Sequence, residues 1–524
     1  MLKADAPVAL SDLERDLYRR LVPQDHFLRR LLELIDFEPL RVELHAAYSA
    51  EKGRPPFDPL AMLKLEILAR HYRLSDREVV RQAQVHVAFR LFVGLGLDSP
   101  LPHHSLLTYF RHRVGAQRLQ QIFHTLLGQA RELGLVRDRL RIKDATHVIA
   151  NIAIPSTIGL VAQTRDQLLT ALQPFAAAAV TQEQQRVLAI RIASADLPDE
   201  ERLVHRVAHL RAILAWADQI PQQEPFHQAT SRAQEQLRQT LTLAHKVLAD
   251  REPDAKDKLL SVHDPDARRG KHGDYFEGYL LDVTMDADSQ LITALNVLPG
   301  NGDEGADAAL LIRQEEQTHG NDVAALSQDG SGYRGESLRE LTDPQGLNVE
   351  VFVPPTEQPP TGKFTPEQFT LSADGKTLSC PAGQSTTWSQ PVVNGVSFVF
   401  KASACGSCPL RAQCLSKPTG QRRAVVKNLY EAEYRAAQAK AKTAAYGEVR
   451  KEHPAIERKL AELVRWHDLR RTRYRGQPRV LRQGILTALV VNLKRMVRLL
   501  KDRLSARVEA ALAGTVRAGL VAGG

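Results

Sequence analysis

Hydrophobic residues recur every three to four positions through most of the first 135 residues, which is the spacing of helices with one buried face. The clearest run is PFDPLAMLKLEILARHYRLSDREVVRQAQVHVAFRLFVGLG. It breaks at RLSDREVV, where Ser75 or Asp76 can cap the next helix. Short helices joined by tight turns, the last one basic, are typical of helix-turn-helix domains. We therefore expect an all-α domain over 1–135 that serves DNA binding or assembly.

After this domain, hydrophobic and polar residues alternate along the chain, which is the spacing of a strand. LRIKDATHVIAN predicts a strand within 136–156, and the Ala-, Gln- and Leu-rich stretch 157–255 predicts a large insertion of long helices. Within 256–355, YFEGYLLDVTMDADSQLITALNVLPG predicts two strands joined at DADSQ. A helix, a strand ending at Asp329, a second helix and the strand LNVEVFVPP follow. We expect these segments to form one sheet with the first strand.

The remaining chain divides into three parts. Residues 356–425 are rich in Gly, Pro, Ser and Thr and contain all four cysteines, so we expect a loop-like, cysteine-rich insertion. Residues 426–505 are expected to be helical apart from a break at YRGQPR, with a tail over 506–524. The order of elements predicts an α/β core with a mixed sheet, interrupted by both insertions.

Positive charge is concentrated in one part of the 524 residues. The whole chain has a formal charge of +9, but residues 421–503 alone hold 22 Lys and Arg against 8 Asp and Glu. The densest stretch is LAELVRWHDLRRTRYRGQPR. Such a segment contacts nucleic acid or forms a solvated helix face, and the interleaved Trp466 and Tyr474 favour contact.

The sequence also limits the cellular compartments in which we expect the protein. The first 20 residues lack an apolar stretch suited to a signal peptide, and ILTALVV is far shorter than the roughly 20 residues that span a bilayer. Four clustered cysteines are too few for a secreted disulfide scaffold. We expect a cytoplasmic, nucleoid-associated protein that neither contacts membranes nor acts on a small-molecule substrate.

Three acids occupy positions suited to chemistry. Asp144 lies in the first strand of the sheet, Asp329 at the end of a later strand, and Glu457 in a closing helix. Acids brought together without a cation repel one another, and oxygen ligands select Mg²⁺ or Mn²⁺. A metal pair of this kind supports phosphodiester cleavage. The alternative is that each acid is a strand-end cap or a salt-bridge partner.

Several stretches resemble the DDE transposases of bacterial insertion sequences, in the subgroup with a helical amino-terminal domain and a cysteine cluster before the final Glu. Besides the helical run above, they are HHSLLTYFRHR, KDATHVIAN, HDPDARRGKHGDYFEGYLLDV, LPGNGDEGADAALLI, SQDGSGYRG, CPAGQ, CGSCPLRAQC and EHPAIERKLAELVRWHDLRRTRYRG. The resemblance extends from about residue 55 to 500 and is weakest across 157–250.

This resemblance implies a ribonuclease H-like core in which Asp144, Asp329 and Glu457 form the catalytic triad and bind Mg²⁺ or Mn²⁺. It implies cleavage of transposon ends and transfer of their 3′-hydroxyl strands to target DNA, commonly by a homodimer. A ribonuclease H-like nuclease without strand transfer, and an inactive transposase-derived DNA-binding protein, remain alternatives. The family's Lys seven residues after the Glu is absent, since Val464 and then Arg465 stand there.

If Glu457 faces the metals, the following basic residues extend along bound double-stranded DNA. The loop HDPDARRGKHG is expected to hold DNA phosphates, although its Asp264 and Asp266 are alternative metal ligands. The expected DNA contacts are Arg268, Arg269, Lys271, Arg465, Arg470, Arg471, Arg473, Tyr474 and Arg475.

The four cysteines have the spacing C-x24-C-x2-C-x5-C. In a cytosolic protein this pattern favours a structural, tetrahedral Zn²⁺ site formed by Cys380, Cys405, Cys408 and Cys414. An iron–sulfur cluster, two disulfides or four reduced thiols are the alternatives. A closed shell of four thiolates leaves no open position for catalysis, so we expect the metal to stabilise a segment with few hydrophobic residues.

Overall fold

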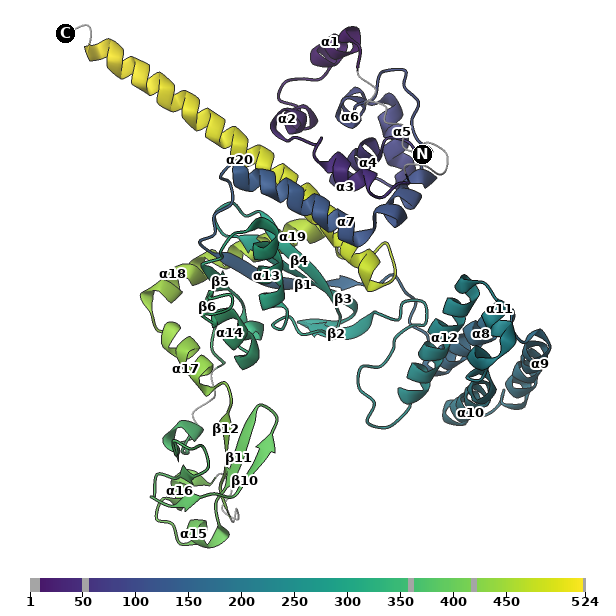
Figure 1. The fold of residues 1–524 in the computed structure, drawn as a ribbon, viewed down its shortest axis with the longest axis vertical. Coiled ribbons are helices and arrows are strands. Elements are labelled where there is room, and N and C mark those ends of the chain that lie inside the picture. The colour runs from purple at the N-terminus through teal and green to yellow at the C-terminus, as the bar shows by residue number, and fades with distance from the viewer. Residues whose placement is uncertain (1–9, 50–55, 357–361, 416–421, 522–524) are drawn as a thin grey trace.

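The computed structural model describes residues 10–49, 56–356, 362–415 and 422–521. A mixed six-stranded sheet lies at the centre, and the amino-terminal helices, the helical insertion and the cysteine-rich part project from it in different directions (Figure 1). The chain is therefore a mixed α/β protein with many helices. Within these ranges no helix has the length and apolar character needed to cross a membrane.

The central sheet is organised around β1. β1 pairs antiparallel with β3 on one side and parallel with β5 on the other, and β5 pairs parallel with β6. β3 also pairs antiparallel with β4 and with β2. The bounds are β1 (Arg141–Ile149), β2 (Arg268–His272), β3 (Asp274–Asp286), β4 (Ile292–Pro299), β5 (Ala325–Ser327) and β6 (Glu350–Phe352).

The predicted order of strands and helices in this region is confirmed, including the turn DADSQ between β3 and β4. Two details differ. The stretch Arg268–His272 was expected to be a loop but forms the edge strand β2, because its backbone pairs with β3 despite its polar side chains. The strand before Asp329 ends at Ser327, and Asp329 instead caps the short 3-10 helix η2 (Gly330–Gly332).

Helices flank the sheet, and one of them joins it to the amino-terminal domain. α20 contacts β4, α7, α4 and α2, and α7 and α20 run side by side (Figure 1). Its buried stretch between Val480 and Val497 makes the hydrophobic core of the sheet continuous with that of the helical domain. The flanking helices are α13 (Ala308–His319), α14 (Gly335–Thr342), α17 (Glu431–Lys440), α18 (Ala444–Glu452), α19 (Pro454–Trp466) and α20 (Gln477–Val521).

The expected all-α character of the amino-terminal region is confirmed over its described residues. Ser75 caps α5 by accepting a hydrogen bond from the Glu78 amide (3.2 Å). Arg111, at the start of α7, is buried and pairs with Glu66 (2.6 Å) and Asp76, so its side chain does not face solvent. The helices are α1 (Asp12–Leu21), α2 (Phe27–Leu34), α3 (Leu40–His45), α4 (Pro59–His71), α5 (Asp76–Val85), α6 (Val87–Val93) and α7 (Ser105–Glu132).

Residues 157–255, which were expected to contain long helices, do contain them. It folds around a hydrophobic core of its own, separate from the core of the sheet. Its α-helices are α8 (Thr157–Leu172), α9 (Ala177–Ala193), α10 (Asp199–Ala217), α11 (Glu224–Gln228) and α12 (Ser231–Ala249). This part is therefore an insertion between β1 and β2 that buries its apolar residues independently.

The cysteine-rich part is more ordered than the expected loop. Two small antiparallel sheets and two short helices surround a compact core of Phe369, Leu378, Phe398, Phe400 and Val425. The strands escape detection in the sequence because they are short, from two to five residues each. The elements are β7 (Thr370–Leu371), β8 (Leu378–Ser379), β9 (Ser385–Thr386), β10 (Ser389–Val392), β11 (Gly395–Val399), α15 (Ala402–Gly406), α16 (Arg411–Cys414) and β12 (Ala424–Asn428).

The helical prediction for the carboxyl-terminal part needs two corrections. The non-helical break is longer than YRGQPR, because α19 ends at Trp466 and α20 begins at Gln477. Asp468 and Gly476 both have positive φ in this break (55° and 89°). In addition, α20 continues through most of the segment expected to be a tail, and 522–524 lie outside the described residues.

Candidate active site and DNA-contact surface

Asp144 is half-buried in the middle of β1, where its Oδ1 accepts a hydrogen bond from the Ala145 amide (2.8 Å). Burial, reinforced by the negative charges of Asp329 and Glu304, raises the pKa of Asp144 to about 6. Asp329 and Glu304 are thus close enough to Asp144 to act on its carboxylate electrostatically. Strand β1 places the first expected acid beside the second.

Asp329 lies two residues after the end of β5, and helix α19 is fastened to that same strand end. Asp329 accepts hydrogen bonds from the amide (3.1 Å) and hydroxyl (2.5 Å) of Ser331. Arg450 donates to the Gln328 carbonyl (2.6 Å), and His453 Nδ1 lies 3.0 Å from Ser327 Oγ. Arg450 therefore positions the backbone next to Asp329.

Glu457 lies one helical turn after His453, in the first turn of α19. The buried face of α19, which includes Ile456 and Leu460, packs against β1, while the Glu457 side chain is exposed. Only the start of the helix is fastened to the end of β5, through the contact of His453 with Ser327. Unlike Asp329 and Glu304, however, Glu457 is not among the main charges acting on Asp144.

Glu304 and His272 belong to this neighbourhood, although the sequence did not single out Glu304. Glu304 lies in the loop between β4 and α13, and its Oε1 is 3.2 Å from Nδ1 of His272 at the end of β2. The only signal was an acid in the glycine-rich stretch LPGNGDEGADAALLI, which has no periodicity to place it.

Asp144 and Asp329 are suitable ligands for a hard divalent cation, because they lie near each other, on β1 and just after its partner strand β5, and carboxylate oxygens are the ligands that such ions prefer. Across the ranges that the structure describes, no three or more His, Cys, Asp or Glu side chains are spaced to hold a metal ion. The chemistry of the donors therefore fits Mg²⁺ or Mn²⁺, whereas the positions of the side chains are more open than a formed metal site.

The break between α19 and α20, residues 467–476, carries most of the expected DNA contacts. Its backbone pairs in parallel with the last residue of β1, since the Ile149 amide donates to the Arg470 carbonyl (2.8 Å) and the Thr472 amide donates to the Ile149 carbonyl (2.9 Å). Arg471 and Arg473 project from this segment, and Arg473 lies 3.6 Å from Asp468. We name residues 467–476 the arginine loop.

Some side chains of the arginine loop are engaged within the protein. Arg470 donates to the His147 carbonyl (2.6 Å), and Arg475 donates to the Asn151 carbonyl (3.1 Å) while staying exposed. The Tyr474 ring lies between the guanidinium groups of Arg111 (5.8 Å) and Arg482 (5.1 Å). Arg470 and Tyr474 therefore anchor the loop, and Arg465, at the end of α19, is exposed.

The β2–β3 hairpin provides a second basic surface. Arg269 and Lys271 are exposed and lie over the Tyr275 ring, at 5.0 and 5.7 Å from its centroid. Tyr275 is itself 66% exposed and was not identified from the sequence. Arg268 differs, because it forms an ion pair with Asp257 (2.6 Å) and is largely buried.

The two acids of HDPDARRGKHG have a structural partner. Asp264 is buried and accepts a hydrogen bond from the Gly476 amide (2.9 Å), and Asp266 accepts one from the Gln477 amide (2.8 Å). Both carboxylates therefore hold the end of the arginine loop where α20 begins, which favours a helix-capping role over metal binding.

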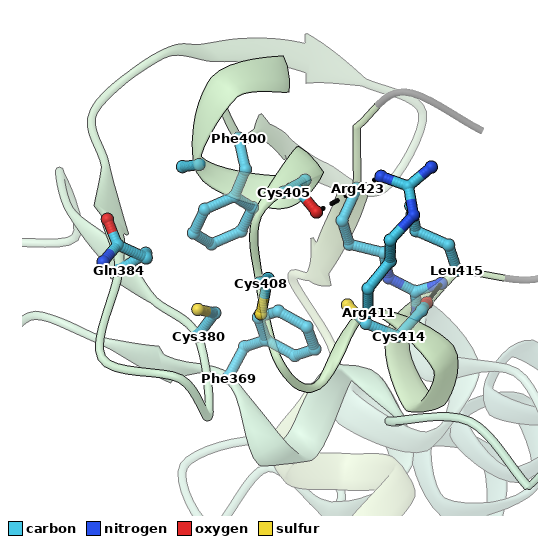
Figure 2. A pocket seen from close by; sticks show the side chains of 11 residues that line it. Phe369, Cys380, Gln384, Phe400, Cys405, Cys408, Arg411, Cys414, Leu415 and Arg423 are labelled. Atoms are coloured by element: carbon cyan, nitrogen blue, oxygen red, sulfur yellow. Dashed lines mark hydrogen bonds between the residues drawn. The ribbon is translucent and has the colours of Figure 1, made fainter. Parts of the chain in front are cut away.

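The four cysteines line one small cavity, together with Phe369 and Phe400 (Figure 2). All four are free thiols, so the structure contains neither of the two disulfides considered from the sequence. Burial, with the other three thiols adding to it, raises the pKa of Cys414. Four converging thiols are a suitable donor set for Zn²⁺, but their sulfurs also fall outside metal-binding spacing.

Two family models match the chain. A transposase domain (DUF772) matches residues 16–113, and a transposase DDE domain matches residues 379–497. The second match includes Glu457, the four cysteines and the arginine loop, whereas Asp144 and Asp329 lie between the two matched ranges. No solved structure matches the chain.

Proposed function

Since the chain belongs to the DDE transposases of insertion sequences, we propose that it cleaves the ends of its element and joins the freed 3′ ends to target DNA. The observation that carries this proposal is the meeting of Asp144 and Asp329 at adjacent parallel strands, with α19 fastened to the same strand end. Neighbouring strand ends are where catalytic groups gather in open α/β sheets.

We further propose that the core is ribonuclease H-like. The support is the strand order β4-β3-β1-β5-β6, in which β3 runs antiparallel to β1 and β5 and β6 run parallel to it. Helix α19 then carries Glu457 to the side of the sheet where the first two acids lie. In this arrangement Asp144, Asp329 and Glu457 are the catalytic carboxylates.

In the proposed reaction, a water oxygen bonds to the phosphorus at the transposon end and the bond to the 3′ oxygen breaks, leaving a 3′-hydroxyl. The oxygen of that hydroxyl then bonds to a target phosphorus, and the target's own 3′ oxygen leaves. Bound Mg²⁺ or Mn²⁺ supplies activation of the attacking oxygen and charge stabilisation at the leaving one. The three carboxylates hold the cation and orient the phosphodiester.

The proposed path of double-stranded DNA follows the exposed cations. The exposed cations are Arg465 at the end of α19, Arg471, Arg473 and Arg475 in the arginine loop, and Arg269 and Lys271 on the β2–β3 hairpin. Their charges suit phosphate contacts, which position the DNA without reading its sequence. We propose binding of transposon ends and target DNA by a homodimer.

Replacing Arg471 and Arg473 by Ala is expected to weaken DNA binding and reduce its salt dependence. Each lost phosphate contact lowers the slope of log affinity against log salt by roughly 0.9, so the double variant should lose about 2 units. The measurement is a duplex-binding titration at several salt concentrations. The matched control replaces Arg186 and Arg191, two exposed arginines of α9. Equal slopes for both variants and the wild type would assign the arginine loop to structure alone.

We also propose that the cysteine cavity binds one structural Zn²⁺. The support is the convergence of Cys380, Cys405, Cys408 and Cys414 on one cavity and the small size of the surrounding hydrophobic core. A metal would add the stability that five buried hydrophobic side chains cannot supply.

A further inference from the structure

The loop between β4 and α13 is tied to the strand that carries Asp144. The buried ammonium of Lys143 donates a hydrogen bond to the Glu304 carbonyl. Lys143 also forms ion pairs with Asp282 on β3 (3.0 Å) and Asp307 at the start of α13 (3.4 Å). The backbone of Glu304 is thereby fixed to the residue that precedes Asp144.

The same loop is closely packed against the turn that carries Asp329. A Cβ atom on Gly305 would lie 2.2 Å from the Ser331 carbonyl oxygen, so glycine is needed for this approach. Asp303 forms an ion pair with Arg334, just beyond that turn. Glu304 is consequently held between the two catalytic aspartates.

His272 is fixed from the opposite side. It ends β2, and a Cβ atom on Gly270 in that strand would lie 1.9 Å from the Gly300 carbonyl oxygen, so strand and loop touch directly. The Glu304 carboxylate is only 17% exposed and lies 3.2 Å from His272 Nδ1, whereas the imidazole is 36% exposed. The carboxylate therefore orients a ring whose other nitrogen remains available to a ligand.

The surroundings favour the protonated form of this imidazole. The hydrogen bond that His272 donates to Glu304 raises the pKa of His272, burial opposes this, and the charge of Asp144 raises the pKa further while Arg470 lowers it. His147 on β1 faces the same ring at 5.6 Å between centroids. A fixed cation beside catalytic acids attracts an anionic ligand.

We propose that His272, oriented by Glu304, binds a nonbridging oxygen of the scissile phosphodiester beside Asp144. His272 is then a catalytic residue, and Glu304 is a positioning residue that acts through it. Charge on the phosphoryl oxygens grows in the transition state, so a fixed donor stabilises that state more than the bound substrate. This inference rests on the proposed function.

The test compares His272→Ala, Glu304→Gln and the double variant of the full chain. The probe is a duplex carrying the terminal sequence that borders the reading frame, cleaved in single-turnover reactions with Mg²⁺. His272→Ala is expected to slow cleavage about 100-fold, as loss of one transition-state donor does, with duplex affinity in EDTA changed less than about threefold. Glu304→Gln should slow cleavage less, and add nothing in the His272→Ala background.

The matched control is His245→Ala. His245 also pairs with a carboxylate, Asp218 (2.9 Å), but on the helical insertion, and its loss should leave cleavage unchanged. His272→Gln repeats the test if thermal unfolding shows that the Ala variant does not fold.

Three outcomes overturn the inference, and a fourth overturns the proposed function on which it rests. A folded His272 variant whose cleavage rate is within threefold of the wild-type rate would show that His272 does not contact the scissile phosphate. If the rate reduction in the double variant equals the product of the two single reductions, Glu304 does not act through His272. A loss of Mn²⁺ affinity in Glu304→Gln would also exclude the positioning role, because Glu304 would then act on the metal. A wild-type protein that binds the duplex but never cleaves it overturns the proposed function itself, which distinguishes the two failures.

Discussion

Asp144→Ala, Asp329→Ala and Glu457→Ala are each expected to reduce DNA cleavage by at least about 1,000-fold, because each removes a carboxylate that holds a metal worth several kcal/mol to the transition state. Affinity for duplex DNA should change little, since it comes mainly from phosphate contacts. The measurement pairs single-turnover cleavage in Mg²⁺ with duplex binding in EDTA, so that chemistry and binding are separated.

The matched control is Glu448→Ala on α18. Glu448 is 71% exposed and pairs with Lys451, one turn along the same helix, so its loss should leave both measurements unchanged. A variant of the triad that cleaves within tenfold of the wild type would remove that residue from the catalytic set. The test matters most for Glu457, because its side chain is exposed and it is not among the main charges that act on Asp144.

The second large effect is expected in the cysteine-rich part. Replacing both Cys405 and Cys408 by Ser should abolish binding of roughly one zinc per chain and greatly accelerate amide exchange across 362–415. Structural zinc contributes about 10–16 kcal/mol to the folding of small domains, far more than this compact core can replace. Elemental analysis and hydrogen exchange provide the two measurements.

Ser407→Ala is the matched control, because Ser407 lies between the two cysteines and contributes no thiol. It should retain zinc and exchange protection. A wild-type protein that contains no zinc and still protects the amides around the cavity would show that the four thiols pack as ordinary core side chains. Iron in place of zinc would favour the iron–sulfur alternative.

The sequence predicted the parts of the fold whose periodicity is strong. Alternation in LRIKDATHVIAN located β1 and with it Asp144, and helical spacing located α19 and Glu457. β2 was missed because Arg268, Arg269 and Lys271 resemble a loop, and only pairing with β3 makes the segment a strand. Edge strands of this kind depend on a distant partner that local composition does not reveal.

The residues of the candidate site differ in the same way in how well the sequence predicts them. Its acids on regular elements were predicted, whereas Glu304 lies on an aperiodic loop whose position depends on Lys143 and on a close approach at Gly305. Likewise, the sequence identifies the arginines of the arginine loop but not their orientation. Arg470 turns inward to the His147 carbonyl, while Arg471 remains exposed. Only tertiary contacts separate anchoring arginines from those available to DNA.

The most direct test of the central claim is a strand-joining assay with the wild-type protein. A duplex carrying the terminal sequence, labelled on the strand that is cleaved to leave a 3′-hydroxyl, is incubated with a circular target and either Mg²⁺ or Ca²⁺. We expect labelled 3′ ends covalently joined to the target with Mg²⁺, and no joined product in the Asp144→Ala variant. Binding of both DNAs without cleavage in Mg²⁺ or Mn²⁺ would contradict the account.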